Sequence, residues 1–258
     1  MRRCADISFV SALASGSARL YGLLSSRLTP GLRHAQHVYV DRLFEHIPGR
    51  RWLDVGCGHC LIPRWMPQRC AEEAALVASA REAVGADPCA DSLARHATLK
   101  HKVLASAEAL PFADASFDLV TANMVMEHLP DPLRSLREIA RVLRPGGRLI
   151  AHTPNFDYPL MRLLPMMPQS LKDALASLME GRAGGDVFPT FYRFNRCRDI
   201  EPACRNAGFA SVQIDTIESA PITWRLGPLA AGELAMMRLL RQPSLVRRRA
   251  NLIVQAIK

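Results

Sequence analysis

The sequence has no uninterrupted run of about 18 apolar residues, the length that a helix needs to span a bilayer. Near the N-terminus two arginines precede a modestly apolar stretch, but Ser11, Ser15, Gly16 and Ser17 interrupt it. Such interruptions are atypical of the hydrophobic region of a signal peptide. We therefore expect residues 1–48 to form an N-terminal helical extension and the protein to be cytoplasmic.

A regular framework of cysteines is also missing, because the seven cysteines are odd in number and irregularly spaced. Disulfide-rich secreted domains are much shorter and carry even numbers of cysteines. The composition therefore excludes a secreted disulfide scaffold and indicates mostly free thiols in a reducing compartment. With 258 residues, of which 49% are hydrophobic, the chain can form one main domain with additions.

Acidic residues are scarce in the last part of the chain. The formal net charge is +9, and from residue 225 onward Glu233 is the one acid against seven basic residues: Arg225, Arg238, Arg241, Arg247, Arg248, Arg249 and Lys258. This local excess argues against a nucleic-acid groove running through the fold. It predicts a solvated face or a peripheral contact with an acidic or membrane surface, and it carries no signal for an oligomeric state.

Short β-like runs alternate with helical patterns in the central part, which is typical of a parallel α/β sheet. The expected strands are residues 51–55, 83–86, 103–105, 117–122, 148–152, 211–217 and 251–257. The last two are expected to pair at a sheet edge. Helical spacing predicts helices over 132–144, closed by Pro145-Gly146-Gly147, and over 198–207, closed by Gly208.

These patterns divide the chain into four expected parts. They are the N-terminal extension (1–48), an α/β core (49–156), an inserted lid or substrate segment (157–195), and a C-terminal part that completes the sheet around a basic helical insertion (196–258). The inserted segment is rich in proline, and its helical stretch from Leu160 to Glu180 carries four methionines.

The stretch "RWLDVGCGHC" permits two interpretations. Cys57-Gly58-His59-Cys60 matches the tetrapeptide of disulfide isomerases, whose first thiol needs a helix N-terminus. Those enzymes carry Trp directly before the first Cys, where this chain has Gly56. A zinc site would lack a second ligand pair at the usual spacing, although Cys70 and Cys89 are present. Thiol oxidoreductase chemistry is thus a remote alternative.

The second interpretation is a cofactor loop. An apolar strand ends in Asp54 and turns through Gly56 and Gly58, which allow a close backbone approach, into a helix whose first amides can bind an anionic group. In "VGADP" a second strand ends in Asp87, where a carboxylate can accept hydrogen bonds from ribose hydroxyls. The alternative for Asp87 is an N-cap of the following helix.

"LDVGCG", "GADP" and the run from "ASAEALPF" to "AHTPN" together resemble the class I S-adenosylmethionine-dependent methyltransferases of the type 11 group, over about residues 51–155. "DVFPTFYRFNRCRDIEPACRNAGF" is similar to the segment after the core of many bacterial members. The resemblance implies a Rossmann-like α/β fold with a seven-stranded, mostly parallel sheet, an antiparallel last strand and helices on both faces. It also implies S-adenosylmethionine as the cofactor.

By this resemblance Asp54, Gly56 and Gly58 surround the methionine part of the cofactor, and Asp87 holds the ribose. The resemblance also assigns Ser106 and the backbone of Ala107 to the adenine, and Asn123 to the methyl end. Two departures stand out. Cys60 replaces the usual third glycine of the loop, and Ser106 replaces an acid that contacts the adenine amino group. The chain between Asp54 and Asp87 is also longer than usual, near "MPQRCAEEAALVASA".

His128 is the candidate general base, because it follows the fourth strand and a histidine suits proton transfer near neutrality. The alternative is a histidine that packs or orients Glu127. The Glu127-His128 pair resembles that of ubiquinone-pathway O-methyltransferases, but Met124 stands where those enzymes have a further metal-binding Glu. We therefore expect no metal site.

Candidates for binding the acceptor are His152, Asn155, Tyr192 and Asn195, each of which could instead cap a turn. Methionines can line an adaptable apolar pocket, and a basic tail can approach lipid headgroups. The leading hypothesis is a methyltransferase (EC 2.1.1.-) acting on a small-molecule, glycan-precursor or lipid-like acceptor. A noncatalytic regulatory module that binds the cofactor is the main alternative.

Overall fold

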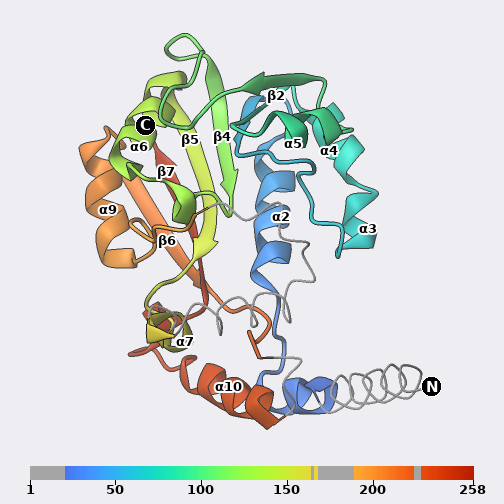
Figure 1. The fold of residues 1–258 in the computed structure, drawn as a ribbon, viewed down its shortest axis with the longest axis vertical. Helices are drawn as coiled ribbons and strands as arrows, with labels where there is room; N and C mark the ends of the chain where they lie inside the picture. Colours follow the sequence, from blue (N-terminus) through green and yellow to red (C-terminus); the bar gives the residue numbers. More distant parts are fainter. Residues whose placement is uncertain (1–20, 164–165, 168–188, 224–227) are drawn as a thin grey trace, which may run out of the picture. The chain divides into compact units, whose positions relative to one another are not determined.

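The computed structural model describes residues 21–163, 166–167, 189–223 and 228–258 (Figure 1). The chain divides into two compact units. The core unit comprises residues 36–156, 189–216 and 251–258, and the accessory unit comprises the described parts of 1–35, 157–188 and 217–250. The four expected parts of the chain stay a prediction, since both units combine segments that are distant in the sequence.

A seven-stranded sheet forms the centre of the core unit. Its strands are β1 (Arg51–Val55), β2 (Glu82–Asp87), β3 (His101–Leu104), β4 (Phe117–Asn123), β5 (Leu143–Pro154), β6 (Ser211–Ile217) and β7 (Asn251–Ile257). Their order is β3-β2-β1-β4-β5-β7-β6. Strands β1 to β5 pair in parallel, and β7 pairs antiparallel with β5. The predicted fold and the pairing of the last two strands are confirmed.

The central strands are buried because parallel sheets are covered on both faces. In β1 and β4 most side chains are buried, and Trp52, Leu53, Leu119 and Val120 are fully inaccessible. Helices lie around the sheet (Figure 1). In the core unit they are α2 (Ala35–His46), α3 (Pro67–Cys70), α4 (Glu73–Ser79), α5 (Ala90–Arg95), the 3₁₀ turn η1 (Met126–His128), α6 (Pro132–Val142) and α9 (Cys197–Asn206).

Two local predictions were wrong. The helix predicted over 132–144 ends at Val142, and Pro145-Gly146-Gly147 lies inside β5, where the pairing with β4 shifts between Phe117 and Leu119. The cofactor loop does not enter a helix directly, because residues 56–66 form turns and α3 begins at Pro67. Ile62 precedes a proline, which disfavours helical backbone, and its amide donates to the Glu73 carboxylate (3.0 Å).

The accessory unit contains α7 (Pro159–Leu163), α10 (Pro228–Leu239) and the 3₁₀ turn η3 (Val246–Arg248). Its centre is Glu233, whose carboxylate accepts hydrogen bonds from the Tyr158 hydroxyl (2.6 Å) and from the amides of Ile222 and Thr223 (both 2.8 Å). Most of the methionine-rich stretch lies outside the described residues. Across the described ranges, no helix is both long and apolar enough to cross a membrane.

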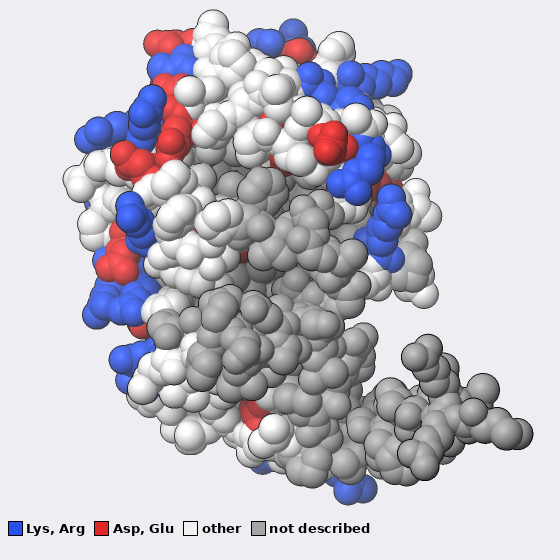
Figure 2. Space-filling model, viewed as in Figure 1, with Lys and Arg blue, Asp and Glu red and all other residues white. Residues whose placement is uncertain are grey.

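On the face drawn in Figure 2, basic and acidic side chains of the described residues lie next to one another. Among the described residues, several side chains of opposite charge pair directly. Arg51 contacts Glu82 at 2.8 Å, and Arg205 contacts Glu201 at 3.0 Å. Such exposed pairs stabilise a protein by at most about 1 kcal/mol each.

Candidate functional site

The predicted cofactor residues gather at the carboxyl edge of the parallel strands. The register pairs Asp54 of β1 with Gly85 of β2 and with Thr121 of β4, and it pairs Asn123 of β4 with His152 of β5. In open α/β sheets ligands bind outside this edge. The sheet therefore brings Asp54, Asp87 and Asn123 to the edge where a ligand is expected.

The loop after β1 depends on glycine at Gly56. Its φ of 68° lies in the left-handed region, and a Cβ there would stand 2.3 Å from Cγ2 of Val125. The Gly56 amide donates to the Ala86 carbonyl at 2.7 Å. Gly58 also has a positive φ, 57°, and its amide donates to Asp87 Oδ2 at 2.9 Å. A side chain on residue 56 would therefore collide with Val125 and require a strained backbone.

Cys57 is a packing residue of this loop. Its side chain is buried, and a Cβ on Gly85 would stand 2.7 Å from its sulfur. Burial, together with the Asp54 and Asp87 carboxylates, raises the pKa of the Cys57 thiol well above its ordinary value. A reactive dithiol needs the opposite shift and a helix N-terminus, which the turns after β1 do not supply. The thiol oxidoreductase interpretation is therefore wrong.

Replacing the third glycine with Cys60 costs no backbone strain, because Cys60 does not have a left-handed φ. Its thiol is half-buried and has a raised pKa, chiefly from burial and then from Glu73. Within the described residues, no group of three or more His, Cys, Asp or Glu side chains is arranged to hold a metal ion.

Asp54 is a buried carboxyl with a polar neighbour on β4. The Thr121 hydroxyl donates to Asp54 Oδ1, and the Trp52 indole N–H donates to the same hydroxyl at 2.6 Å. Burial raises the pKa of the Asp54 carboxyl to about 7; the Thr121 hydrogen bond lowers it, while the Asp87 and Glu73 carboxylates raise it further. The carboxyl therefore changes its charge near neutrality.

Asp87, the last residue of β2, accepts hydrogen bonds from the loop after β1 and from the residue that precedes α5. One carboxylate oxygen accepts from the Gly58 amide, and the other accepts from the Cys89 amide at 2.8 Å. The N-cap position of α5 is Cys89, so Asp87 is not the cap itself, although it binds the cap amide. Each carboxylate oxygen has two lone pairs, so both can accept a further bond from a ligand.

The expected adenine side is the loop after β3. Ser106 is exposed, Ala107 is buried, and the Ser106 hydroxyl accepts from the Glu108 amide at 3.3 Å. Glu108 is tied to the start of α6: its carboxylate accepts from the Asp131 amide (3.0 Å) and its carbonyl from the Arg134 side chain (3.1 Å).

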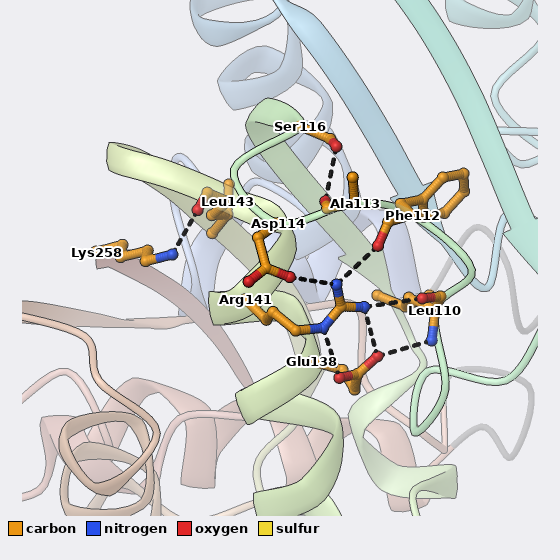
Figure 3. A network of polar contacts seen from close by, with 9 residues as sticks. All are labelled: Leu110, Phe112, Ala113, Asp114, Ser116, Glu138, Arg141, Leu143 and Lys258. Carbon is orange, nitrogen blue, oxygen red and sulfur yellow. Dashed lines mark hydrogen bonds and ion pairs between the residues drawn. The ribbon is translucent and has the colours of Figure 1, made fainter.

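Arg141 fixes the continuation of this loop (Figure 3). Its guanidinium donates to the carbonyls of Leu110 (2.9 Å) and Phe112 (2.7 Å) and to the Asp114 carboxylate (2.8 Å). Glu138 holds the same guanidinium through both carboxylate oxygens and also accepts from the Leu110 amide. The Arg141 hydrogen bonds lower the pKa of Glu138. Helix α6 thus sets the path of the adenine loop.

The expected methyl end lies at the tips of β4 and β5. Asn123 is half-buried, and its carboxamide oxygen is 2.9 Å from His152 Nδ1. The next residue, Met124, is exposed and has a left-handed φ of 55°, and its amide donates to the His152 carbonyl at 2.8 Å. Strained backbone of this kind is enriched at functional sites.

The residues after β4 are joined to the segment that begins at residue 189. The carbonyl of Glu127 accepts from the amides of Phe191 (2.8 Å) and Tyr192 (3.2 Å), and His128 Nδ1 is 3.0 Å from the Pro189 carbonyl. The Glu127 side chain is buried and accepts from the Thr153 hydroxyl at 2.9 Å. Burial raises the pKa of Glu127.

The acceptor candidates differ in exposure. His152, Asn155 and Asn195 are buried, and Tyr192 is half-buried against Phe156, with the two ring centroids 5.2 Å apart. The side-chain NH₂ group of Asn195 donates to the Thr153 hydroxyl (2.6 Å) and to the Pro154 carbonyl (3.0 Å). The structure brings Asp54, Asp87 and Asn123 to one edge of the sheet, whereas His152, Asn155 and Asn195 are buried.

Thr121, Tyr39 and Arg141 were missed in the sequence. A polar threonine inside an otherwise buried strand was a signal for Thr121. The helical pattern of 132–144 placed Arg141 on a polar face without indicating its loop contacts. Nothing in the local sequence marked Tyr39, whose ring stacks on His152 with centroids 5.5 Å apart.

A family model described as "Methyltransferase domain", that of the type 11 group, matches residues 53–151. Methyltransferase GfsG of Streptomyces halstedii is 37% identical over 46% of this chain and 44% of GfsG, so the chain spans less than half of that relative. The ubiquinone/menaquinone biosynthesis C-methyltransferase UbiE of Xanthomonas campestris pv. campestris is 30% identical over 62% of this chain and 68% of that protein.

Among solved structures, an S-adenosylmethionine-dependent methyltransferase of Thermotoga maritima aligns with a TM-score of 0.51 and 17% identity. The alignment covers 88% of this chain and 90% of that one. At this identity the likeness shows a shared fold.

Proposed function

Because the chain belongs to the class I S-adenosylmethionine-dependent methyltransferases of the type 11 group, we propose that it transfers a methyl group from S-adenosylmethionine to a small-molecule, glycan-precursor or lipid-like acceptor. The observation that supports this most is the loop after β1, where a Cβ on Gly56 would stand 2.3 Å from Val125 Cγ2 and the Gly58 amide donates to Asp87. The family favours a transferase over a noncatalytic cofactor-binding module.

The residues present fit this cofactor. Asp54 and the glycine loop would hold the methionine part, Asp87 the ribose, and Ser106 with the Ala107 backbone the adenine. When bound, the cofactor supplies an electrophilic methyl group on a sulfonium, so the protein mainly provides alignment. Asn123 would face the methyl end.

His128 is proposed to accept the proton of an oxygen nucleophile. A carbonyl can only accept a hydrogen bond, so the Pro189 carbonyl selects the tautomer with the proton on Nδ1. In the neutral ring Nε2 is then the basic nitrogen. We propose that Nε2 lies within hydrogen-bonding reach of the nucleophile, because η1 closely follows β4, whose last residue is Asn123.

The function is tested in two steps. Isothermal titration with S-adenosylmethionine should show saturable binding, and incubation with the tritiated-methyl cofactor and cell extract should label one acceptor fraction. Separation into lipid, sugar and protein fractions then gives the acceptor class. Binding without any labelled fraction would support the regulatory alternative, and absence of binding would reject both.

A lipid-like acceptor is proposed as the finer assignment, because one relative is named for ubiquinone and menaquinone biosynthesis and the accessory unit exposes Arg247 and Arg248.

The protein should co-sediment with phosphatidylglycerol vesicles at low salt and not at high salt. Arg247→Gln with Arg248→Gln should weaken this binding by about 30-fold, at about 1 kcal/mol per charge. Arg137→Gln, on the exposed face of α6, is the control. Equal binding to neutral phosphatidylcholine vesicles would contradict the prediction.

Cofactor affinity should depend on the charge of Asp54. The amino group of the cofactor is cationic, and the carboxyl has a pKa of about 7. The affinity should therefore rise by about tenfold between about pH 6 and pH 8, as the carboxyl ionises. Titration calorimetry should show that the cofactor affinity of Asp54→Asn does not change with pH. If the affinity of this variant depends on pH as that of the wild type does, another group causes the dependence.

The same carboxyl also makes the stability of the ligand-free protein depend on pH. This effect has the opposite sign to the effect on cofactor affinity, because the stability falls as the carboxyl ionises. Its pKa is raised above the value in the unfolded chain, so its stabilising contribution is complete at low pH and is lost as the pH rises through about 7. The melting temperature of Asp54→Asn relative to wild type should therefore increase between about pH 4 and pH 7 and stay level at higher pH, because the two states bind different numbers of protons only between 3.8 and about 7.

A further inference from the structure

His152 of β5 is the cross-strand neighbour of Asn123 on β4, and three residues contact its ring. Its Nδ1 is 2.9 Å from the carboxamide oxygen of Asn123, and its Nε2 is 3.2 Å from that of Asn251. The ring stacks on Tyr39 of α2 at an interplanar angle of 27°. The side chain is 2% exposed, which leaves it little access to an acceptor from outside.

These contacts bear on the orientation of the Asn123 carboxamide. An asparagine side chain can present either its oxygen or its NH₂ group to a neighbour. With the proton on Nδ1, the ring donates to the Asn123 oxygen and selects that orientation, and Nε2 then accepts from an Asn251 carboxamide whose NH₂ group is turned toward the ring. Asn251 of β7 and Tyr39 of α2 in turn restrain the imidazole. The orientation of the Asn123 carboxamide therefore depends on residues of two other elements.

We propose that His152 is a positioning residue that fixes the Asn123 carboxamide through Nδ1, and that it does not bind the acceptor. The inference rests on the proposed function, in which Asn123 faces the methyl end of the cofactor. The carboxamide oxygen has two lone pairs, of which one takes the histidine N–H. The other remains for the polarised C–H groups of a sulfonium methyl, a weak but directional contact.

Two substitutions separate the two ring nitrogens. The side-chain nitrogen of asparagine is as many bonds from Cα as Nδ1, and that of glutamine as many as Nε2. His152→Asn therefore keeps the contact with Asn123, and His152→Gln keeps the contact with Asn251. Both variants remove the ring that stacks on Tyr39, so they are matched for lost packing.

The readout is the ratio of the affinities for S-adenosylmethionine and S-adenosylhomocysteine, which differ at the sulfur by one methyl group and one charge. Titration calorimetry on the full chain gives both affinities without an acceptor. Wild type and His152→Asn should prefer S-adenosylmethionine by a similar factor, whereas His152→Gln should lower that factor by about threefold to fivefold. A wild type without preference, or equal ratios in both variants, would overturn the proposal.

Melting temperatures show whether each variant folds. If His152→Gln does not fold, Asn123→Ala is used, because it removes the oriented amide from a half-buried position. Asn123→Ala should lower the ratio of the affinities for S-adenosylmethionine and S-adenosylhomocysteine by as much as is expected of His152→Gln. An unchanged ratio would refute the inference. If wild type binds neither compound, the proposed function itself fails, which is distinct from binding without the predicted change in ratio.

Discussion

Gly56→Ala should reduce the affinity for S-adenosylhomocysteine by about 100-fold or more. The alanine would have to adopt a φ of 68°, which costs about 1–2 kcal/mol, and its Cβ would stand 2.3 Å from Val125 Cγ2. Overpacking of this kind typically costs about 1–3 kcal/mol more. We expect the ligand-free loop to relieve this strain by moving away from the geometry that holds the cofactor, so that binding must restore the strain, and about 3 kcal/mol corresponds to 100-fold in affinity. Titration calorimetry measures the loss.

The matched control is Gly49→Ala. Gly49 has a similar φ of 73°, a Cβ there would meet nothing within 4 Å, and the residue precedes β1 at the opposite edge of the sheet. It should lower the melting temperature and leave the affinity unchanged. Gly58→Ala, which has a positive φ and an open Cβ position, should be intermediate. Equal affinities for all three variants would show that the loop does not bind the cofactor.

The second large effect is expected for Asp87→Asn. Its carboxylate accepts from the amides of Gly58 and Cys89, and a carboxamide has one oxygen to offer the two donors. The bonds to the two amides exist without the cofactor, so losing one of them lowers the melting temperature. Losing the charge-assisted hydrogen bond that we propose with the ribose costs about 1.5–3 kcal/mol of binding free energy. The affinity for S-adenosylhomocysteine should therefore fall by about 10-fold to 100-fold.

Asp118→Asn serves as its control. Asp118 accepts from the Arg51 amide at 2.8 Å and pairs with Arg144, but it stands near the amino end of β4. The substitution should lower the melting temperature without changing the affinity. If Asp87→Asn changes only the melting temperature as well, the ribose assignment is wrong and Asp87 acts as a latch between two loops.

Most strands were predictable because each is a short apolar run bounded by turn residues. The bounds of β1, β6 and β7 agree with the prediction, and β7 was paired correctly with β6. The turns after β1 were not predictable by pattern, since their course depends on the Glu73 carboxylate, which binds a distant amide. The end of α6 was placed too late because Pro145-Gly146-Gly147 can close a helix or form an irregular strand equally well.

In the candidate site, the sequence predicted which residues reach the carboxyl edge and not how they are supported. Strand ends determine the positions of Asp54, Asp87 and Asn123. The partners of these residues come from other elements, as Thr121 and His152 do, and only the sheet register brings them together. The inserted segment remains a prediction where it lies outside the described residues.

The sheet order also constrains how the protein assembles during synthesis. Strand β6 neighbours β7 and not β5, although it leaves the ribosome earlier than β7. A nascent chain that ends before residue 251 therefore exposes an open edge on β5, a state that favours pairing with other chains. Strands β1 to β5 can pair in the meantime, so the edge with Asp54, Asp87 and Asn123 can form before β6 is added.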